Sequence, residues 1–272
     1  MLGGYFAPIH QVGLNEVTRQ AVAARLHEIR RRSSDTTAGR CRAQLSAAFV
    51  RLMQEGLCEM NPCIGTKGQT ERAQRDRVLS TDELRAVWNA CDLNTDFGKV
   101  VRLLILTGAR REEIGALRWS EVNLDAGTIN LPAERTKNGR AHTLTLPKVA
   151  MDIIRSVPRM RDRDYLFGIR SIGFRSWQVQ KARFKDGIVK HWKLHDIRRS
   201  VVTGMCEIGI EPHVVEAVVN HFSGHKGGVA GIYNKAEYKP QTKQALGMWA
   251  DHVRSIVSGD ARKVVNLSTR HA

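Results

Sequence analysis

One of the four tyrosines, Tyr233, follows a glycine-rich segment that begins with His221. Two segments upstream end in arginine, Thr-Gly-Ala-Arg at 107–110 and His-Asp-Ile-Arg at 195–198, and Lys137 lies between them. A phosphodiester anion repels nucleophiles, so its cleavage requires cations and hydrogen-bond donors beside the non-bridging oxygens. One tyrosine, two arginines, two histidines and a lysine are residue types suited to attack on a phosphodiester.

The two arginines selected by this spacing are Arg110 and Arg198. A guanidinium group matches phosphate oxygens with two parallel hydrogen bonds, and Arg198 shares a helix face with His195 at i, i+3. Arg111 and Arg199 are the neighbouring alternatives. One step along a helix turns a side chain by about 100°, so the two members of each pair cannot have the same role. A surface ion pair is the alternative interpretation of each arginine taken alone.

Lys137 precedes Asn138-Gly139, which strongly predicts a hairpin turn. A turn can project a lysine into a cleft, where the ammonium group would protonate a leaving oxygen as a general acid. An exposed turn lysine is the alternative interpretation, and Lys148 and Arg140 are the nearby alternative cations.

Tyr233 must lose a phenolic proton whose reference pKa is about 10, so nearby cations and histidines would have to stabilise the phenolate. His195 and His221 are expected to exchange protons with the phosphate and the tyrosine, and His225 is the alternative to His221. Packing of the tyrosine on a helix is the other interpretation. Three glycines shortly before it favour a segment that moves over a packed one; they are Gly227, Gly228 and Gly231.

Two acidic residues are expected to orient the catalytic side chains without contacting the phosphate themselves. Glu113 lies three residues after Arg110 and is expected to orient an arginine, while Asp196 either does the same or caps its own helix. A metal site is less favoured. His191 and His195 are four residues apart, but the glutamate of the H-E-x-x-H motif is absent and the spacing shows no third ligand. We expect no cofactor and no metal.

The five cysteines are odd in number and contain no C-x-x-C pair, so free buried thiols are expected.

The charge balance points to a polyanionic partner. Lys and Arg number 43 against 27 for Asp and Glu, giving a net charge of +16 and a pI near 10.1, and nucleic acid is the leading candidate. No apolar run approaches the ~20 residues of a membrane-spanning helix, and no secretory signal opens the chain. We expect a soluble protein of the bacterial cytoplasm, associated with DNA and not with a membrane.

The first 60 residues predict two helices. Thr18 can cap one that runs through Ile29, and Thr36 or Thr37 can cap a second that runs to Leu52 and stops at Gly56. Arginines spread over these helices and their junction are expected to contact phosphates, a solvated face being the alternative. They are Arg25, Arg30, Arg31, Arg32, Arg40 and Arg42.

A polar, non-periodic stretch at 61–76 predicts a linker, after which a second domain covers 77–272. A capping box, Ser80 with Glu83, begins its first helix. Further helices are expected at 98–106, 111–117, 148–156, 196–208 and 212–219, and strands at 127–132 and 141–146. The pattern predicts an α+β fold, mostly helical with few strands.

Taken in order, the motifs T-G-x-R-x-x-E, a lysine in a short polar turn, H-D-x-R-R, N-H-x-S-G and G-I-Y resemble those of the tyrosine recombinase (phage integrase) family, from about Arg77 to Met248. The resemblance implies that residues 1–60 are a partial helical core-binding domain. It also implies that residues 77–272 are a catalytic domain with a small antiparallel sheet. Compared with phage and genomic-island integrases, the N-terminal arm-binding domain and the start of the core-binding domain are expected to be absent.

The resemblance further implies a site-specific recombinase, or integrase, of mobile elements that cleaves and rejoins DNA through a 3′-phosphotyrosyl link on Tyr233. Its catalytic residues would be Arg110, Lys137, His195, Arg198, His221 and Tyr233. The implied partners are double-stranded DNA and three further copies in a homotetramer on paired sites, with accessory DNA-bending proteins left open. An apolar segment, Ala245, Leu246, Trp249 and Val253, would either dock on a neighbouring subunit or pack in its own. The alternatives are a type IB topoisomerase-like nicking-closing enzyme, a non-catalytic DNA-binding relative, and a metal-dependent nuclease.

Overall fold

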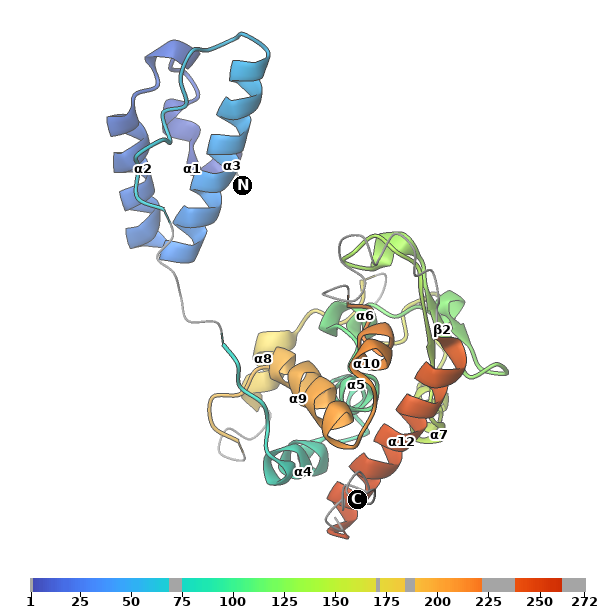
Figure 1. Cartoon of the computed structure of the whole chain (residues 1–272). Coiled ribbons are helices and arrows are strands. Elements are labelled where there is room, and N and C mark those ends of the chain that lie inside the picture. Colours follow the sequence, from blue (N-terminus) through green and yellow to red (C-terminus); the bar gives the residue numbers. More distant parts are fainter. Residues whose placement is uncertain (1, 69–74, 170–171, 184–188, 222–237, 261–272) are drawn as a thin grey trace, which may run out of the picture. The chain divides into compact units, whose positions relative to one another are not determined.

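The computed structural model describes residues 2–68, 75–169, 172–183, 189–221 and 238–260 (Figure 1). The chain divides into two compact units, Met1–Arg75 and Asp76–Ala272. Each unit has its own hydrophobic core, so the two are described separately.

The first unit is a helical hairpin with short helical turns before it. Two long helices, α2 (Arg19–Arg32) and α3 (Asp35–Gln54), pack against each other. They are preceded by α1 (Leu2–Tyr5) and the 3-10 turns η1 (Ala7–Ile9) and η2 (Leu14–Glu16). Apolar residues at helical spacing form the core between them; on the long helices these are Val22, Leu26, Ile29, Ala38, Cys41, Leu45 and Phe49.

The ends of these helices confirm most of the predicted signals. The Thr18 hydroxyl accepts a hydrogen bond from the Ala21 backbone N–H (3.1 Å) at the start of α2. The choice of Thr36 or Thr37 for α3 was wrong, because Ser34 is extended and its hydroxyl accepts the Thr37 N–H (3.1 Å). Gly56, with φ of +71°, terminates α3 as predicted.

Residues 61–66, predicted to begin a linker, instead belong to the first unit. The Asn61 side chain donates to the Ser46 carbonyl and hydroxyl. The Arg42 guanidinium donates to the Cys63 carbonyl and the Thr66 hydroxyl. The segment is polar because side-chain hydrogen bonds, rather than an apolar stripe, hold it to α3.

The second unit is α+β, mostly helical with one small antiparallel sheet, as predicted. Its helices are α4 (Thr81–Ala90), α5 (Asp96–Thr107), α6 (Arg111–Gly115), α7 (Lys148–Arg155), α8 (Trp177–Arg183), α9 (Leu194–Glu207), α10 (Pro212–Val218) and α12 (Lys239–Ser258), with 3-10 turns η3 (Trp119–Glu121) and η4 (Ala133–Arg135). The strands β1 (Val122–Asn123), β2 (Thr128–Leu131) and β3 (His142–Thr145) form one antiparallel sheet in that order, with Ile129 opposite Leu144. The predicted capping box of Ser80 and Glu83 begins α4.

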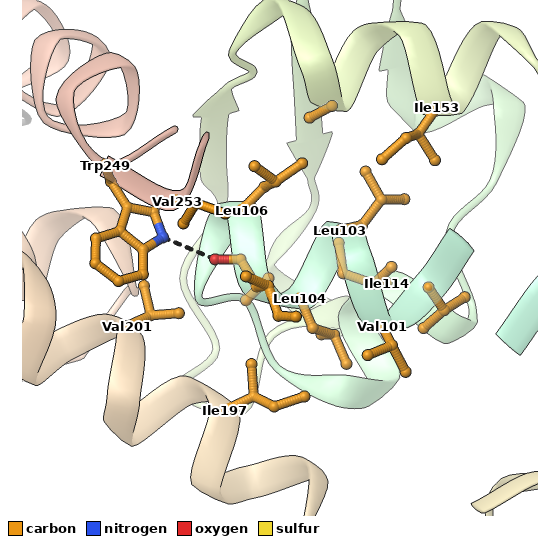
Figure 2. Close-up of a cluster of buried hydrophobic side chains, with 14 of the residues drawn as sticks. Val101, Leu103, Leu104, Leu106, Ile114, Ile153, Ile197, Val201, Trp249 and Val253 are labelled. Carbon is orange, nitrogen blue, oxygen red and sulfur yellow. Dashed lines mark hydrogen bonds between the residues drawn. The ribbon is translucent and has the colours of Figure 1, made fainter. Parts of the chain in front are cut away.

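Helix α5 is the centre of the core and is packed by α4, α6, α7, α9 and α12. Ten of its twelve residues are buried. Figure 2 shows Leu103 and Leu104 of α5 among side chains of the surrounding helices. The Trp249 indole of α12 donates to the Ile105 carbonyl (2.7 Å). The apolar face of α12 therefore packs within its own subunit, the second of the two alternatives.

Four of the five cysteines are buried free thiols, and the fifth, Cys206, is exposed. Within the described residues, no helix is long and apolar enough to cross a membrane.

Candidate active site

The end of α10 forms a tight turn to which three other elements are bonded. The Asn220 N–H donates to the Ala217 carbonyl (3.2 Å), and the His221 N–H donates to the Glu216 carbonyl (2.9 Å). This pair closes the helix in the Schellman pattern, which needs a left-handed residue. Asn220 takes that conformation, with φ of +49°. The carbonyls at the end of a helix have no hydrogen-bond donor within the helix. Here the backbone carbonyls of residues 218, 219 and 220 each accept a hydrogen bond from a side chain of another element.

Arg198, on α9, binds the middle carbonyl of this turn. Its two terminal nitrogens donate to the Gly108 carbonyl (2.7 Å) and the Val219 carbonyl (2.6 Å). Burial, followed by the positive charge of Arg110 and opposed by Glu113, lowers the pKa of Arg198 to about 10. The group therefore remains a buried cation at neutral pH, and no carboxylate among the described residues forms an ion pair with it.

Arg110, between α5 and α6, binds the next carbonyl. One terminal nitrogen donates to Asn220 O (2.9 Å) and the other to Glu113 Oε1 (2.7 Å). Glu113 is buried, and its second oxygen accepts the Arg110 backbone N–H (2.7 Å). Both the main chain and the side chain of Arg110 are thus held by one carboxylate, in the place where the sequence predicted an orienting acid.

Lys137 is exposed in the predicted turn between β2 and β3. Its neighbour Asn138 donates from Nδ2 to the Asn220 side-chain oxygen (2.8 Å) and backbone carbonyl (3.2 Å). The positive charge of Lys137 makes the smallest of the contributions that lower the pKa of His195. The alternative lysine, Lys148, is exposed at the first position of α7.

His142, which begins β3, binds the first carbonyl of the turn. Its Nε2–H donates to Val218 O (3.1 Å). Burial of the ring lowers the pKa of His142. The hydrogen bond to Val218 and the charge of Glu113 oppose that shift, whereas Arg110 and Arg198 add to it. The imidazole is therefore neutral at neutral pH, with its proton fixed on Nε2 by a partner that can only accept.

His195 is exposed in the first turn of α9. Partial desolvation, followed by the charges of Arg199 and Arg198, lowers the pKa of His195. The adjacent Asp196 is fully buried and accepts the Lys193 backbone N–H (2.7 Å), so it caps the helix. His195 is thereby held at the helix start as a neutral imidazole able to accept a proton.

The alternative arginines have other surroundings. Arg111 forms an ion pair with Glu112 and lies over the Trp177 ring, 5.2 Å from its centroid. Arg199 lies 3.4 Å from Asp196. Neither donates to the carbonyls of the turn, whereas Arg110 and Arg198 both do.

His221 is exposed directly after the turn. Tyr233, His225 and the predicted glycines lie outside the described residues. His191 has φ of +57° and precedes α9, so it does not share a helix face with His195. No group of three or more metal-binding side chains was found in the part of the chain that the structure describes.

The six arginines predicted to bind phosphate differ in their contacts and in their exposure. Arg25 donates to the Tyr5 carbonyl and to Glu28, and Arg30 donates to Asp35 and to the carbonyls of Lys67 and Gly68. Arg42 holds the 63–66 segment, as described above. Arg32 pairs with Glu28 although it is 68% exposed. Arg31 and Arg40 are exposed and form no ion pair with any described residue.

Sequence reasoning missed three residues of this site: Asn138, His142 and Asn220. Asn138 was identified only as a turn residue. An asparagine directly after the apolar run of α10 is a recognisable left-handed helix end, so Asn220 could have been found. Nothing in the sequence indicates the partner of His142.

Comparison with known proteins gives a consistent result. Residues 77–239, more than half of the chain, match the phage integrase family. The prophage integrases IntA and IntZ of Escherichia coli (strain K12) are 23% and 26% identical over 93% and 90% of this chain. The chain spans less than two thirds of these relatives, 63% and 62% of their lengths.

Among solved structures, a lambda integrase tetramer bound to a Holliday junction is similar, with a TM-score of 0.59 and 19% identity. The match covers 82% of this chain and 71% of that one. At this identity the likeness concerns the fold.

Proposed function

Because the chain belongs to the phage integrase family, we propose that it is a site-specific DNA recombinase that cleaves and rejoins DNA through a covalent link to Tyr233. The observation that supports this most directly is the convergence of Arg110 and Arg198 on consecutive carbonyls at 219 and 220. The chain continues from this turn towards Tyr233.

The two arginines would bind the scissile phosphate. A guanidinium group has five N–H donors, and the described contacts of Arg198 and of Arg110 each involve two nitrogens. The remaining donors, which have no hydrogen-bond partner among the described residues, would bind non-bridging oxygens. Because the protein holds both groups in place, they would stabilise the charge that builds up in the transition state without reorganising.

The proton transfers follow from the titrating groups beside the arginines. The Tyr233 hydroxyl would give its proton to neutral His195, and the phenolate oxygen would form a bond to phosphorus. The bond from phosphorus to the 5′-oxygen would break, and Lys137 would protonate that oxygen. His221 would donate a hydrogen bond to the phosphate. The products are a 3′-phosphotyrosyl link and a free 5′-hydroxyl, and attack by a partner strand's 5′-hydroxyl reverses the step.

One phosphodiester is exchanged for another in each step, so the chemistry needs neither a nucleotide nor a metal ion. Double-stranded DNA is the proposed substrate, bound by both units, with Arg31, Arg32 and Arg40 supplying exposed charge in the first. The tetrameric state of the lambda integrase structure supports a homotetramer on paired sites. Whether accessory DNA-bending proteins are required can be tested by comparing recombination between the natural sites with and without such proteins.

The decisive experiment uses a nicked duplex that loses its short 5′-hydroxyl fragment after cleavage, so that religation fails and the adduct accumulates. Incubation in EDTA, followed by a denaturing gel, should show a covalent protein–DNA adduct with the wild-type chain and none with Tyr233→Phe. DNA binding by the variant should be unchanged, because only a hydroxyl is removed. An adduct formed by Tyr233→Phe, or one that requires a divalent metal, would refute the assignment. Supercoil relaxation without strand exchange would indicate the topoisomerase-like alternative.

A further inference from the structure

Beyond the residues proposed to touch the phosphate, two side chains join the lysine hairpin to the turn that binds the arginines. We propose that Asn138 and His142 are positioning residues that set Lys137 relative to Arg110 and Arg198. This inference rests on the proposed function for its catalytic consequence, but the attachment of the hairpin can be measured without catalysis.

The side chain of Lys137 is not held in place by any contact of its own with the described residues. It is exposed, and its ammonium group forms no hydrogen bond or ion pair with any residue that the structure describes. Its location therefore depends on the hairpin that carries it. Misplacing a catalytic group by about 1 Å can cost about 100-fold in rate, so the attachment of this hairpin matters to a general acid.

The tip of the hairpin is attached through an amide pair. Asn138 Nδ2 donates to both oxygens of Asn220 at 2.8 and 3.2 Å, and Asn220 Nδ2 lies 3.4 Å from Asn138 Oδ1. Asn220 is buried, and its backbone is fixed by the closure of α10. Its carbonyl is also the one that accepts Arg110. The residue next to the lysine and one of the arginines therefore share a single acceptor.

The stem is attached independently through His142, whose Nε2–H donates to Val218 O (3.1 Å). Val218 is two residues before Asn220, and the carbonyl between them, that of Val219, accepts Arg198. The two hairpin contacts thus enclose the contact of the second arginine. With both ends of the hairpin attached to one short turn, a shift of that turn would move the lysine and the arginines together.

The test is single-turnover cleavage by full-length variants on two nicked duplexes, one ordinary and one with sulfur in place of the 5′-bridging oxygen. A thiolate leaves without protonation, so the sulfur substrate bypasses the lysine. Asn138→Ala should cleave the ordinary duplex about 10- to 100-fold more slowly and the sulfur duplex within about threefold of wild type. Asn130→Ala is the matched control, since Asn130 lies on the exposed face of the same hairpin and bonds only within it; it should resemble wild type on both.

For the stem, His142→Gln keeps an amide donor near the position of Nε2, whereas His142→Leu removes it. The glutamine variant should retain most of the ordinary-duplex rate, and the leucine variant should show the defect that sulfur rescues. Equal slowing on both duplexes by Asn138→Ala, or equal rates for the two His142 variants, would overturn the proposal.

Amide hydrogen exchange in the free protein separates this inference from the proposed function. Exchange at residues 137–142 should be faster in Asn138→Ala than in wild type, and unchanged in Asn130→Ala. If neither wild type nor any variant cleaves DNA but this difference in exchange is observed, the proposed function fails and the attachment of the hairpin stands. If wild type cleaves and the exchange is unchanged by Asn138→Ala, the attachment fails.

Discussion

Replacing Arg198 by methionine should impair cleavage far more than it destabilises the fold. Burial and the nearby Arg110 lower the pKa of Arg198 well below the usual range of an arginine, to about 10. At about 1.4 kcal/mol per pKa unit, keeping this group charged costs the folded state about 3 kcal/mol. Its two hydrogen bonds to buried carbonyls, each with a charged donor, stabilise the folded state by about 3 to 6 kcal/mol. The net contribution is therefore about 0 to 3 kcal/mol, and methionine fills similar space.

In catalysis, no opposing effect offsets the loss of the Arg198 guanidinium. Loss of one donor to a developing anion costs about 10² to 10³ in rate, so Arg198→Met should cleave the nicked duplex at least about 100-fold more slowly. Urea unfolding should detect a loss of no more than about 3 kcal/mol. Arg199→Met is the control, because Arg199 lies 3.4 Å from Asp196 and, among the described residues, donates to no carbonyl of the turn, although its charge does act on His195. A variant that is fully unfolded without denaturant, or one that cleaves at the wild-type rate, would refute this reasoning.

Three further outcomes are expected. Lys137→Ala should cleave ordinary DNA slowly and be restored by the 5′-sulfur substrate; equal slowing on both would mean that the lysine positions the phosphate instead. Because folding lowers the pKa of His142 below its reference value near 6.5, the unfolded chain binds more protons as the pH falls below about 6.5. The free energy of unfolding should thus fall from pH 7.5 to pH 5, and His142→Gln should flatten that profile in urea titrations. Replacing Arg31 and Arg40 by alanine should reduce the log-log salt slope of DNA binding by about 0.9 for each phosphate that is no longer neutralised, without changing the melting temperature. Arg42→Ala should instead lower the melting temperature, and the reverse pattern would show that the exposed and internal arginines were assigned wrongly.

Local signals were readable from the sequence wherever one short segment determines the structure. The caps at Thr18 and Ser80, the stop at Gly56 and the turn at Asn138-Gly139 depend on residues within four positions, and all were predicted. The start of α3 was misplaced because Ser34 and two threonines are all good capping residues. Their order of preference does not decide which of them adopts an extended backbone.

Long-range contacts were the part that could not be predicted. The contact of Asn138 with Asn220 joins residues 82 apart, and that of Arg110 with Asn220 joins residues 110 apart. The motifs indicated that Arg110 and Arg198 belong to one site, but not that consecutive carbonyls of one turn hold them. Similarly, the six arginines of the first unit look alike in sequence. Only the fold shows that Arg42 holds a neighbouring segment while Arg40 is exposed.

The anchoring of α12 limits how far Tyr233 can travel. Trp249 is buried, its indole donates to Ile105 O, and its ring occupies the space above Gly204, where an added methyl group would lie 2.6 Å from the ring. The N-terminal end of α12 is therefore a fixed point. Tyr233 lies five residues before Tyr238, and a fully extended chain of that length spans roughly 18 Å. Under the proposed function, a phosphate attacked by Tyr233 would therefore lie within that radius, plus the length of the side chain, for as long as α12 stays docked in its own subunit.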